Sequence, residues 1–463
     1  MIKKNEKSKK NKWYKIKIII SLFILFFLIF YAFLLRINYD FLNENYLSIQ
    51  KNLNLTFINK IKKKIKIAIY AFGIKNGGRA RVTSLLINYF IKIKTFKLLL
   101  FTRREKEENE YIIPKDFQRI VIKDDIIKII NKKRIDILIY QLSFYNEIQL
   151  LNNFKNKNIK VIFYTHLSIF DWIYGNYTIF KNLYKNYKNS KYVISIVSFE
   201  NDYIFKKWGI NSILMNNFIT YDYNKIISSN LLSNKILMLG RADAKKKRFH
   251  IGVKAMEYIV KEIPECKMLI ISDLNDIYKL INMINNLNLA KNIIINGYSS
   301  IPEMFFKNIS LNIFPSISEA FPMVICETKL YGIPNIIIGI DYITVSERGN
   351  EIIYDDMPEI LAIKSVNILK NYKYRKILGK EGRRDMKKYN NDLLLIKWTK
   401  LILSIYNGEI YFEKMKNSER QMSQKKLLDI LYHQINFLRI RMNMFKNISI
   451  SEFENFSFME NIT

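Results

Sequence analysis

Short apolar runs recur along this chain, each followed by a turn and then a helix-like stripe, and they constrain the fold most. The first run is KIKIAIYAF at residues 64–72, followed by the turn GIKNGG at 73–78 and by apolar residues at helical spacing from Val82 to Phe90. Strand, glycine turn and helix in this order open a βαβ unit. The run is continuous rather than alternating, which is typical of parallel strands buried on both faces.

Further runs of this kind form two series separated near residues 217–233. In the first series they lie at 97–101, 135–140, 160–164 and 192–197, and in the second at 235–240, 267–272, 292–297, 310–316 and 334–339. A chain of 463 residues is also too long for one core. We therefore predict an α/β fold with two doubly wound, Rossmann-like domains. Their ligands are expected at the carboxyl ends of the strands, in the cleft between the halves.

An uncharged apolar stretch near the N-terminus predicts a membrane anchor. Residues 18–35 contain no charged side chain and follow eight lysines, and eighteen helical residues reach about 27 Å, enough to cross a bilayer core. The lysines predict a cytosolic N-terminus, hence a single-pass type II membrane protein whose body lies in the secretory-pathway lumen if the cell is eukaryotic. A cleaved signal peptide is the rival interpretation, although no small-residue cleavage site follows the stretch. A helix that lies in the membrane interface or inserts the other way is a further alternative.

These patterns together predict the organisation of the whole chain. The expected parts are a basic cytosolic tail at 1–17, a transmembrane anchor at 18–36, a stem at 37–63, a first Rossmann-like domain at 64–220, a second at 221–390, a closing helix at 391–412 and a charged tail at 413–463.

The net charge of +34 suggests a nucleic-acid-binding protein, but the distribution of the charge does not. Lysine is dispersed along the chain and no nucleic-acid-binding motif is present, so we predict no nucleic-acid partner and keep that class as an alternative. The 49% of hydrophobic residues excludes a disordered basic protein. Two cysteines and three histidines exclude a disulfide scaffold and argue against a Cys/His zinc site.

Two cations follow the first strand of the second series. In GRADAKKKRF, Gly240 and Arg241 come directly after the strand at 235–240, and Lys247 precedes a helix. Cations near a helix N-terminus bind a pyrophosphate well, because the helix end adds backbone N–H donors. The alternative is a solvated lysine run.

Two carboxylates follow a later strand, in SISEAFPMVICE. Glu319 lies in the loop, Pro322 suits a helix start, and Glu327 falls in the second helical turn. Carboxylates pair well with the vicinal hydroxyls of a ribose or hexose, although two surface glutamates are the alternative. In the first half, the turn at Gly77 and Gly78 allows close backbone approach to a ligand.

These residues resemble the nucleotide-sugar glycosyltransferases of family 4, with a "glycosyl transferases group 1" domain and the GT-B fold. The resemblance rests on Arg241 and Lys247, on Glu319 and Glu327 eight residues apart, and on YGIP at 331–334. In the first half, NGGRARV at 76–82 and FYTH, which ends at His166, resemble the acceptor-side turn and the active-site histidine of the family.

The resemblance implies a retaining, metal-independent transferase that moves a sugar from a nucleoside diphosphate donor to a glycan or lipid-linked acceptor, with no further cofactor. It implies four catalytic residues: Glu319 and His166 at the sugar, and Arg241 and Lys247 at the diphosphate. Glu327 would bind the ribose. The remaining donor contacts would come from Gly77, Gly78 and the main chain of Ala320, Phe321, Met323 and Val324.

The chain departs from the family pattern at a few positions. Ala320 replaces a glycine after the first glutamate, Ser272 and Asp273 replace a glycine after a strand, and Arg248 replaces the glycine after the lysine. No aliphatic-flanked D-x-D is present, which argues against a metal-dependent transferase of the other major fold. A catalytically silent protein that binds carbohydrate or nucleotide sugar on the same fold is the second hypothesis.

Overall fold

The computed structural model describes the two predicted α/β domains. Its described residues are 64–75, 77–123, 125–142, 159–166, 168, 184, 187–188, 190–220, 226–242, 246–273, 277–339, 345 and 348–408. The predicted basic tail, anchor, stem and C-terminal tail lie outside them. Among the described residues, no helix is both long enough and apolar enough to span a bilayer.

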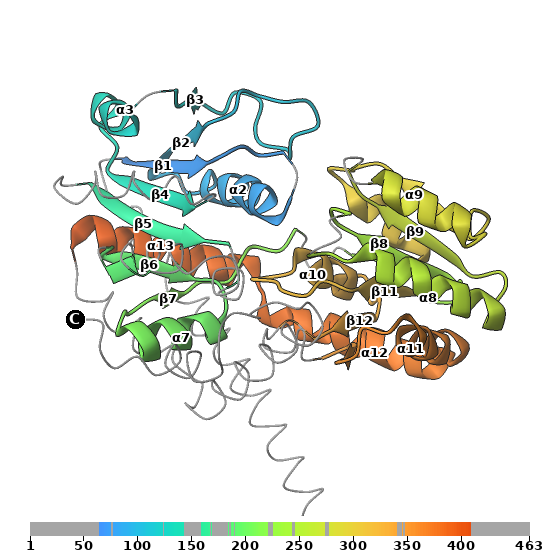
Figure 1. Cartoon of the computed structure of the whole chain (residues 1–463). Helices are drawn as coiled ribbons and strands as arrows, with labels where there is room; N and C mark the ends of the chain where they lie inside the picture. Colours follow the sequence, from blue (N-terminus) through green and yellow to red (C-terminus); the bar gives the residue numbers. More distant parts are fainter. Residues whose placement is uncertain are drawn as a thin grey trace, which may run out of the picture. The chain divides into compact units, whose positions relative to one another are not determined.

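In the described part of the first half, seven strands form one parallel sheet in the order β3-β2-β1-β4-β5-β6-β7. The strands are β1 (Ile65–Ala71), β2 (Phe96–Thr102), β3 (Arg119–Val121), β4 (Ile137–Leu142), β5 (Lys160–Thr165), β6 (Tyr192–Ser195) and β7 (Ile213–Leu214). Its described helices are α2 (Gly77–Phe90), α3 (Ile126–Lys133) and α7 (Ser198–Trp208). Figure 1 shows α2 against this sheet.

The described part of the second half contains six parallel strands in the order β10-β9-β8-β11-β12-β13. The strands are β8 (Lys235–Leu239), β9 (Lys267–Ile271), β10 (Ile293–Asn296), β11 (Leu311–Phe314), β12 (Asn335–Ile338) and β13 (Asn350–Ile353). The helices are α8 (Phe249–Glu262), α9 (Ile277–Asn286), η4 (Pro302–Asn308), α10 (Met323–Leu330), α11 (Pro358–Lys370), α12 (Tyr372–Asp385), η6 (Met386–Lys388) and α13 (Asn391–Asn407).

The prediction of two parallel, doubly wound sheets is confirmed, and the strands that it omitted are all at sheet edges. These are β3, β7 and β13, which are 3, 2 and 4 residues long. An edge strand is covered less completely than a central one, so its sequence need not be a continuous apolar run. The residues of β3, for example, are all half-buried.

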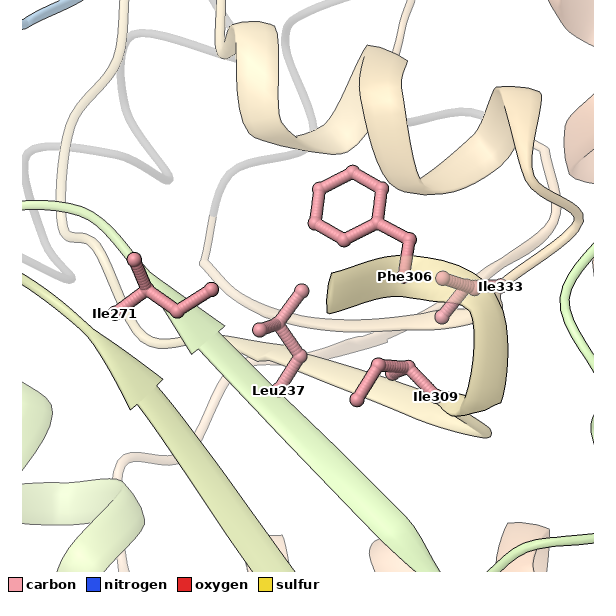
Figure 2. Close-up of a cluster of buried hydrophobic side chains, with 5 residues drawn as sticks. All are labelled: Leu237, Ile271, Phe306, Ile309 and Ile333. Carbon is pink, nitrogen blue, oxygen red and sulfur yellow. The ribbon is translucent and has the colours of Figure 1, made fainter. Parts of the chain in front are cut away.

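A compact apolar cluster fills the space on one side of the second sheet. It consists of Leu237 on β8, Ile271 at the end of β9, Phe306 and Ile309 at η4, and Ile333 before β12. Figure 2 shows these five side chains gathered between β8 and η4. Each is at most 2% exposed, so the short helix η4 is held firmly against the strands whose ends form the site described below.

Helix α12 packs by close approach of glycines. A side chain on Gly379 would meet the carbonyl oxygen of Gly332 at 2.1 Å, and one on Gly349 would meet the backbone of Gly382 at 2.2 Å. Gly349 also has a φ of +69°, which side-chain-bearing residues adopt with strain. Glycine at these positions therefore lets α12 lie directly on the turns that flank α10 and β13.

Helix α13 starts after the second domain and packs on the first sheet (Figure 1). The side chain of Asn391 donates to the hydroxyl of Tyr89 at 2.6 Å and to the carbonyl of Ile219 at 2.8 Å. Trp398 is fully buried, and its ring lies 5.5 Å from the ring of Tyr164 on β5. The end of the described chain is thereby tied to the half in which it began.

A buried ion pair links α10 to the end of α12. Lys329 is 0% exposed and its ammonium lies 3.2 Å from the carboxylate of Asp385, which is 6% exposed. Lys329 also donates to the carbonyl of Val345. Burial lowers the pKa of Lys329 to about 8, and the charge of Asp385 opposes this effect. The negative charge of Asp385 therefore favours the charged form of the buried lysine.

We expect Asp385→Asn to lower the free energy of unfolding by about 3 kcal/mol, because it leaves the Lys329 ammonium buried without a counter-charge. The measurement is the urea midpoint of the full-length chain. Adding Lys329→Met to this variant is the control, and it should recover most of the loss, since no buried charge remains. Equal stability of Asp385→Asn and the unchanged chain would contradict the prediction.

Candidate functional site

The strand order of each sheet creates a place where ligands can bind. In the first sheet the connections leave in opposite directions from β1 and β4, and in the second from β8 and β11. At such a switch point the loops diverge and leave a crevice beyond the carboxyl ends of the strands. Gly77 follows β1, Arg241 follows β8, and Glu319 follows β11. The motifs found in the sequence thus lie at the two switch points.

A cavity of about 420 Å³ is lined by residues of both halves. All of the site residues predicted from the sequence line it: Gly77, Gly78, His166, Arg241, Lys247, Glu319, Ala320, Phe321, Met323, Val324 and Glu327. The structure therefore brings together residues that are up to 250 positions apart in the chain (from 77 to 327). Their individual roles remain predictions.

Lys247 and Glu319 form an ion pair inside the cavity. The ammonium of Lys247 donates to Oε1 of Glu319, and the hydroxyl of Ser316 donates to the same oxygen at 2.6 Å. The two charged side chains are only 17% and 12% exposed. The ammonium also lies 5.3 Å from the centre of the Phe314 ring, at the end of β11. Lys247 is therefore held at the carboxyl end of the sheet, with its charge toward the cavity.

Glu319 carries a negative charge in spite of its burial. Burial acts to raise the pKa of Glu319, but the charges of Lys247 and Lys246 and the hydrogen bonds from Lys247 and Ser316 lower it below its ordinary value. An ionised carboxylate can only accept hydrogen bonds. In this state Glu319 suits the hydroxyl groups of a sugar, and it does not suit a phosphate.

Arg241 is the more exposed of the two predicted diphosphate-binding cations. It has no hydrogen-bond or ion-pair partner among the described residues, whereas Lys247 is held by Glu319. Gly240, just before it, has a φ of +148°, and its amide donates to the carbonyl of Ile271 at 3.1 Å. The glycine lets the chain turn out of β8 so that Arg241 reaches the cavity.

Glu327 is held from the other half of the chain. Its Oε1 lies 3.2 Å from Nε of Arg81, a residue of α2, and accepts a hydrogen bond of 3.1 Å from the hydroxyl of Thr220. Arg81 donates from the same Nε to Thr220 at 3.0 Å. Glu327 is 1% exposed and Arg81 is 7% exposed. Both contacts are made by Oε1, and no described residue donates a hydrogen bond to Oε2.

Sequence reasoning did not assign Arg81 to the site. Its guanidinium also lies 3.5 Å from Oε2 of Glu303 on η4 and 5.6 Å from the centre of the Tyr111 ring. Arg81 and Tyr111 line the same cavity, and Glu303 is in contact with Arg81. A signal was present, because Arg81 comes one helical turn after Gly77 and so faces the same way as the start of α2. The partner of Arg81, however, is 246 positions away.

His166 follows β5 and has two buried ring nitrogens. Neither has a hydrogen-bond partner among the described residues, and the ring lies 4.2 Å from that of Tyr164. Burial, and to a smaller extent the charge of Arg79, lower the pKa of His166 to about 3. The imidazole is therefore neutral at ordinary pH. It can offer a ligand one donor and one acceptor, but it does not supply positive charge.

The positions that depart from the family pattern lie close to these groups. Ser272, Asp273 and Ala320 all line the cavity. Arg248 has a φ of +51°, which glycine adopts without strain, and it caps the start of α8. Its side chain is 1% exposed and donates to the carbonyl of Pro315 and to Asp356, both at 2.9 Å. These two hydrogen bonds compensate for the strained backbone next to Lys247.

The described residues contain no group of three or more His, Cys, Asp or Glu side chains that would hold a metal ion.

We expect the His166 imidazole to stay neutral between about pH 5 and pH 8, because protonation would place a charge in a buried position near Arg79. The chain has three histidines, so ring signals of isotope-labelled histidine can be followed by NMR in a pH titration. His166→Gln identifies the signal, and His250→Gln is the matched control. A His166 signal that titrates within this range would contradict the prediction.

Comparison with known proteins agrees with the geometry of the second half. Residues 222–385 match the family profile described as Glycosyl transferases group 1. The poly(glycerol-phosphate) alpha-glucosyltransferase of Bacillus subtilis (strain 168) is 32% identical over 108 residues, which are 23% of this chain. The matching stretch covers 16% of the length of that relative.

Solved structures with similar folds extend over both halves. Sucrose-phosphate synthase from Thermosynechococcus elongatus has a TM-score of 0.62 at 14% identity, covering 75% of this chain and 100% of that one. Anabaena HepE, in complex with UDP and glucose, has a TM-score of 0.60 at 14% identity, covering 73% and 99%. At this identity the likeness concerns the fold. The chain therefore has a GT-B-like fold of two parallel sheets, and residues 222–385 of its second half are similar to the Glycosyl transferases group 1 domain.

Proposed function

We propose that this protein is a glycosyltransferase that moves a sugar from a nucleoside diphosphate donor to a glycan or lipid-linked acceptor. The observation that carries the proposal is the cavity at the two switch points. It is lined by two cations, Arg241 and Lys247, and by two carboxylates, Glu319 and Glu327. A nucleoside diphosphate sugar has the complementary groups, an anionic diphosphate between two sets of hydroxyls.

The cations account for donor binding and for departure of the leaving group. Arg241 and Lys247 hold the diphosphate, and their charge stabilises the negative charge that develops on it as the sugar bond breaks. Lys247 is already fixed by Glu319, so little reorganisation is needed when the donor enters. In our proposal this stabilisation takes the place of a metal ion, so that the reaction needs no metal and no further cofactor.

The carboxylates account for recognition of the two sugars of the donor. Glu319 accepts hydrogen bonds from hydroxyls of the transferred sugar, and Glu327 accepts hydrogen bonds from the ribose. Neutral His166 contacts the transferred sugar from the first half, through a ring whose nitrogens have no other described partner. The glycines of α2 and the main chain of residues 320–324 approach the donor closely. Retention at the anomeric carbon is proposed from the resemblance to family 4.

The membrane is the other partner that we propose. The support is the uncharged stretch at 18–35 and the lysines before it, which favour a single-pass anchor with a cytosolic N-terminus. The catalytic body would then face the secretory-pathway lumen if the cell is eukaryotic. A lipid-linked or membrane-bound acceptor would suit an enzyme held at the bilayer surface.

We expect Arg241→Ala and Lys247→Ala each to weaken UDP binding by roughly 10- to 150-fold, because each removes a charge-assisted contact worth about 1.5–3 kcal/mol. Calorimetric titration of the full-length chain measures the affinity. Turnover of UDP-glucose and other nucleotide sugars, with EDTA present, tests activity and metal independence in the same preparations.

The matched control is Lys254→Ala, which removes an exposed cation of α8 that does not line the cavity. It should bind UDP as the unchanged chain does. UDP binding without turnover of any nucleotide sugar would favour a catalytically silent binding protein. Equal losses in Arg241→Ala and Lys254→Ala would indicate unspecific attraction by the positive surface and would contradict the proposed site.

We expect a tag at the C-terminus to be protected from protease in sealed membrane vesicles whose lumen corresponds to the secretory pathway. The reason is that the lysines before residue 18 favour the cytosolic side. The measurement is the size of the tagged fragment with and without detergent. A tag that is digested without detergent would place the body in the cytosol and overturn the proposed topology.

A further inference from the structure

Arg81 joins the acceptor-side half to a carboxylate of the proposed donor site. Its Nε lies 3.2 Å from Oε1 of Glu327 and 3.0 Å from the hydroxyl of Thr220, and Thr220 donates to the same Oε1 at 3.1 Å. These three side chains contact one another in pairs. They come from α2, from the segment after β7 and from α10. Oε1 of Glu327 therefore has two contacts, whereas Oε2 has no hydrogen-bond partner among the described residues.

We propose that Arg81 is a positioning residue of the donor site, which fixes Oε1 of Glu327 so that the charged Oε2 is left to accept hydroxyls of the donor. This inference rests on the proposed function, because it takes Glu327 as a ligand of the donor. It goes further in assigning the orientation and the charge of Glu327 to an arginine of the opposite half, so that donor binding depends on the first half being in place.

The geometry favours cooperation between Arg81 and the donor over competition. A carboxylate has about four lone-pair sites on two oxygens. Arg81 and Thr220 both contact Oε1, so a ligand at Oε2 does not need to displace them. Arg81 itself is 7% exposed. Its guanidinium lies 3.5 Å from Oε2 of Glu303 and over the Tyr111 ring, 5.6 Å from the centre of that ring. Contacts on several sides fix the guanidinium before any ligand binds.

The charges around Glu327 explain why a cation is needed there. The pKa of Glu327 is raised: burial and the charge of Glu303 raise it, and the charge of Arg81 and the hydrogen bond from Thr220 lower it less. The pKa of Glu303 is itself raised, by burial first. Without Arg81, burial and the charge of Glu303 favour a protonated Glu327, and the hydrogen bond from Thr220 alone opposes them. A protonated carboxyl group has less capacity to accept hydroxyls, so donor affinity would fall.

The other titratable groups that face Glu327 stay neutral over the useful pH range. Burial is the largest cause of a raised pKa in each of them. They come from the loop before β3, from α10 and from the C-terminal cap of α10, and they are Tyr111, Cys326 and Tyr331. Arg81 and Glu303 are thus the charged neighbours that decide the state of Glu327.

The test is calorimetric binding of UDP, ADP and GDP to the full-length chain between about pH 5.5 and pH 8.5. The folded pKa of Glu327 rises in Arg81→Gln, so its carboxylate is lost as the pH falls. We expect this variant to bind at least tenfold more weakly than the unchanged chain at the acid end, and to recover toward the alkaline end. One unit of pH below the raised pKa corresponds to about a tenfold change in affinity.

Three further variants separate positioning from a general loss of structure. Arg81→Lys keeps the charge and should flatten the pH profile again. Glu303→Gln added to Arg81→Gln removes the neighbouring negative charge and should restore part of the affinity at neutral pH. Arg119→Gln breaks the Arg119–Glu110 ion pair of the same half, whose atoms lie 2.6 Å apart. Neither residue lines the cavity, so this variant should leave the profile unchanged.

The outcomes are distinct. A loss in Arg81→Gln that is the same at every pH, or no loss, overturns the inference while the proposed function stands. If the unchanged chain binds none of the three nucleotides, the proposed function fails first. A thermal melt of each variant shows whether it is folded. If Arg81→Gln does not fold, we compare Arg81→Lys with the double variant Arg81→Lys and Glu303→Gln. The pH dependence of nucleotide affinity is again the criterion.

Discussion

The site depends on two ion pairs, in each of which a largely buried carboxylate that faces the cavity is paired with a cation. Glu319 is paired with Lys247 and Glu327 with Arg81. A buried carboxylate without a partner would take up a proton, because desolvation disfavours the charge. The cations come from different places: Lys247 is from the same domain, whereas Arg81 is from α2 in the other half. One carboxylate is therefore a local feature of the second domain, and the other depends on both halves.

The parallel sheets explain how such charges come to lie together. A central parallel strand is buried on both faces and has few polar side chains, so polar groups gather in the loops at its carboxyl end. The loops after β1, β5, β8 and β11 carry, respectively, the glycines of α2, His166, Arg241 and Glu319. In the second half, the apolar cluster around Phe306 packs η4 against the sheet, and the glycine contacts of α12 hold that helix against the turns at Gly332 and Gly349.

Much of this could be predicted from local sequence. The central strands are continuous apolar runs, and the motif residues lie within a few positions of a strand end, so their place at one edge of a sheet follows from the topology. The edge strands β3, β7 and β13 could not be predicted in this way, since they are 2–4 residues long and partly exposed. Arg81 was visible in NGGRARV, but one arginine among 75 basic residues has no local mark of its role.

The sequence by itself determined the α/β class, the division into two series of strands and the residues that would meet at the carboxyl ends, because these depend on local periodicity and on short spacing. Only the tertiary structure decided which cation pairs with which carboxylate in the site. Electrostatic pairing acts over a few ångströms in space, and the partners Arg81 and Glu327 are far apart along the chain. It also decided the protonation state of His166, because burial by neighbouring elements, which no spacing encodes, sets the pKa.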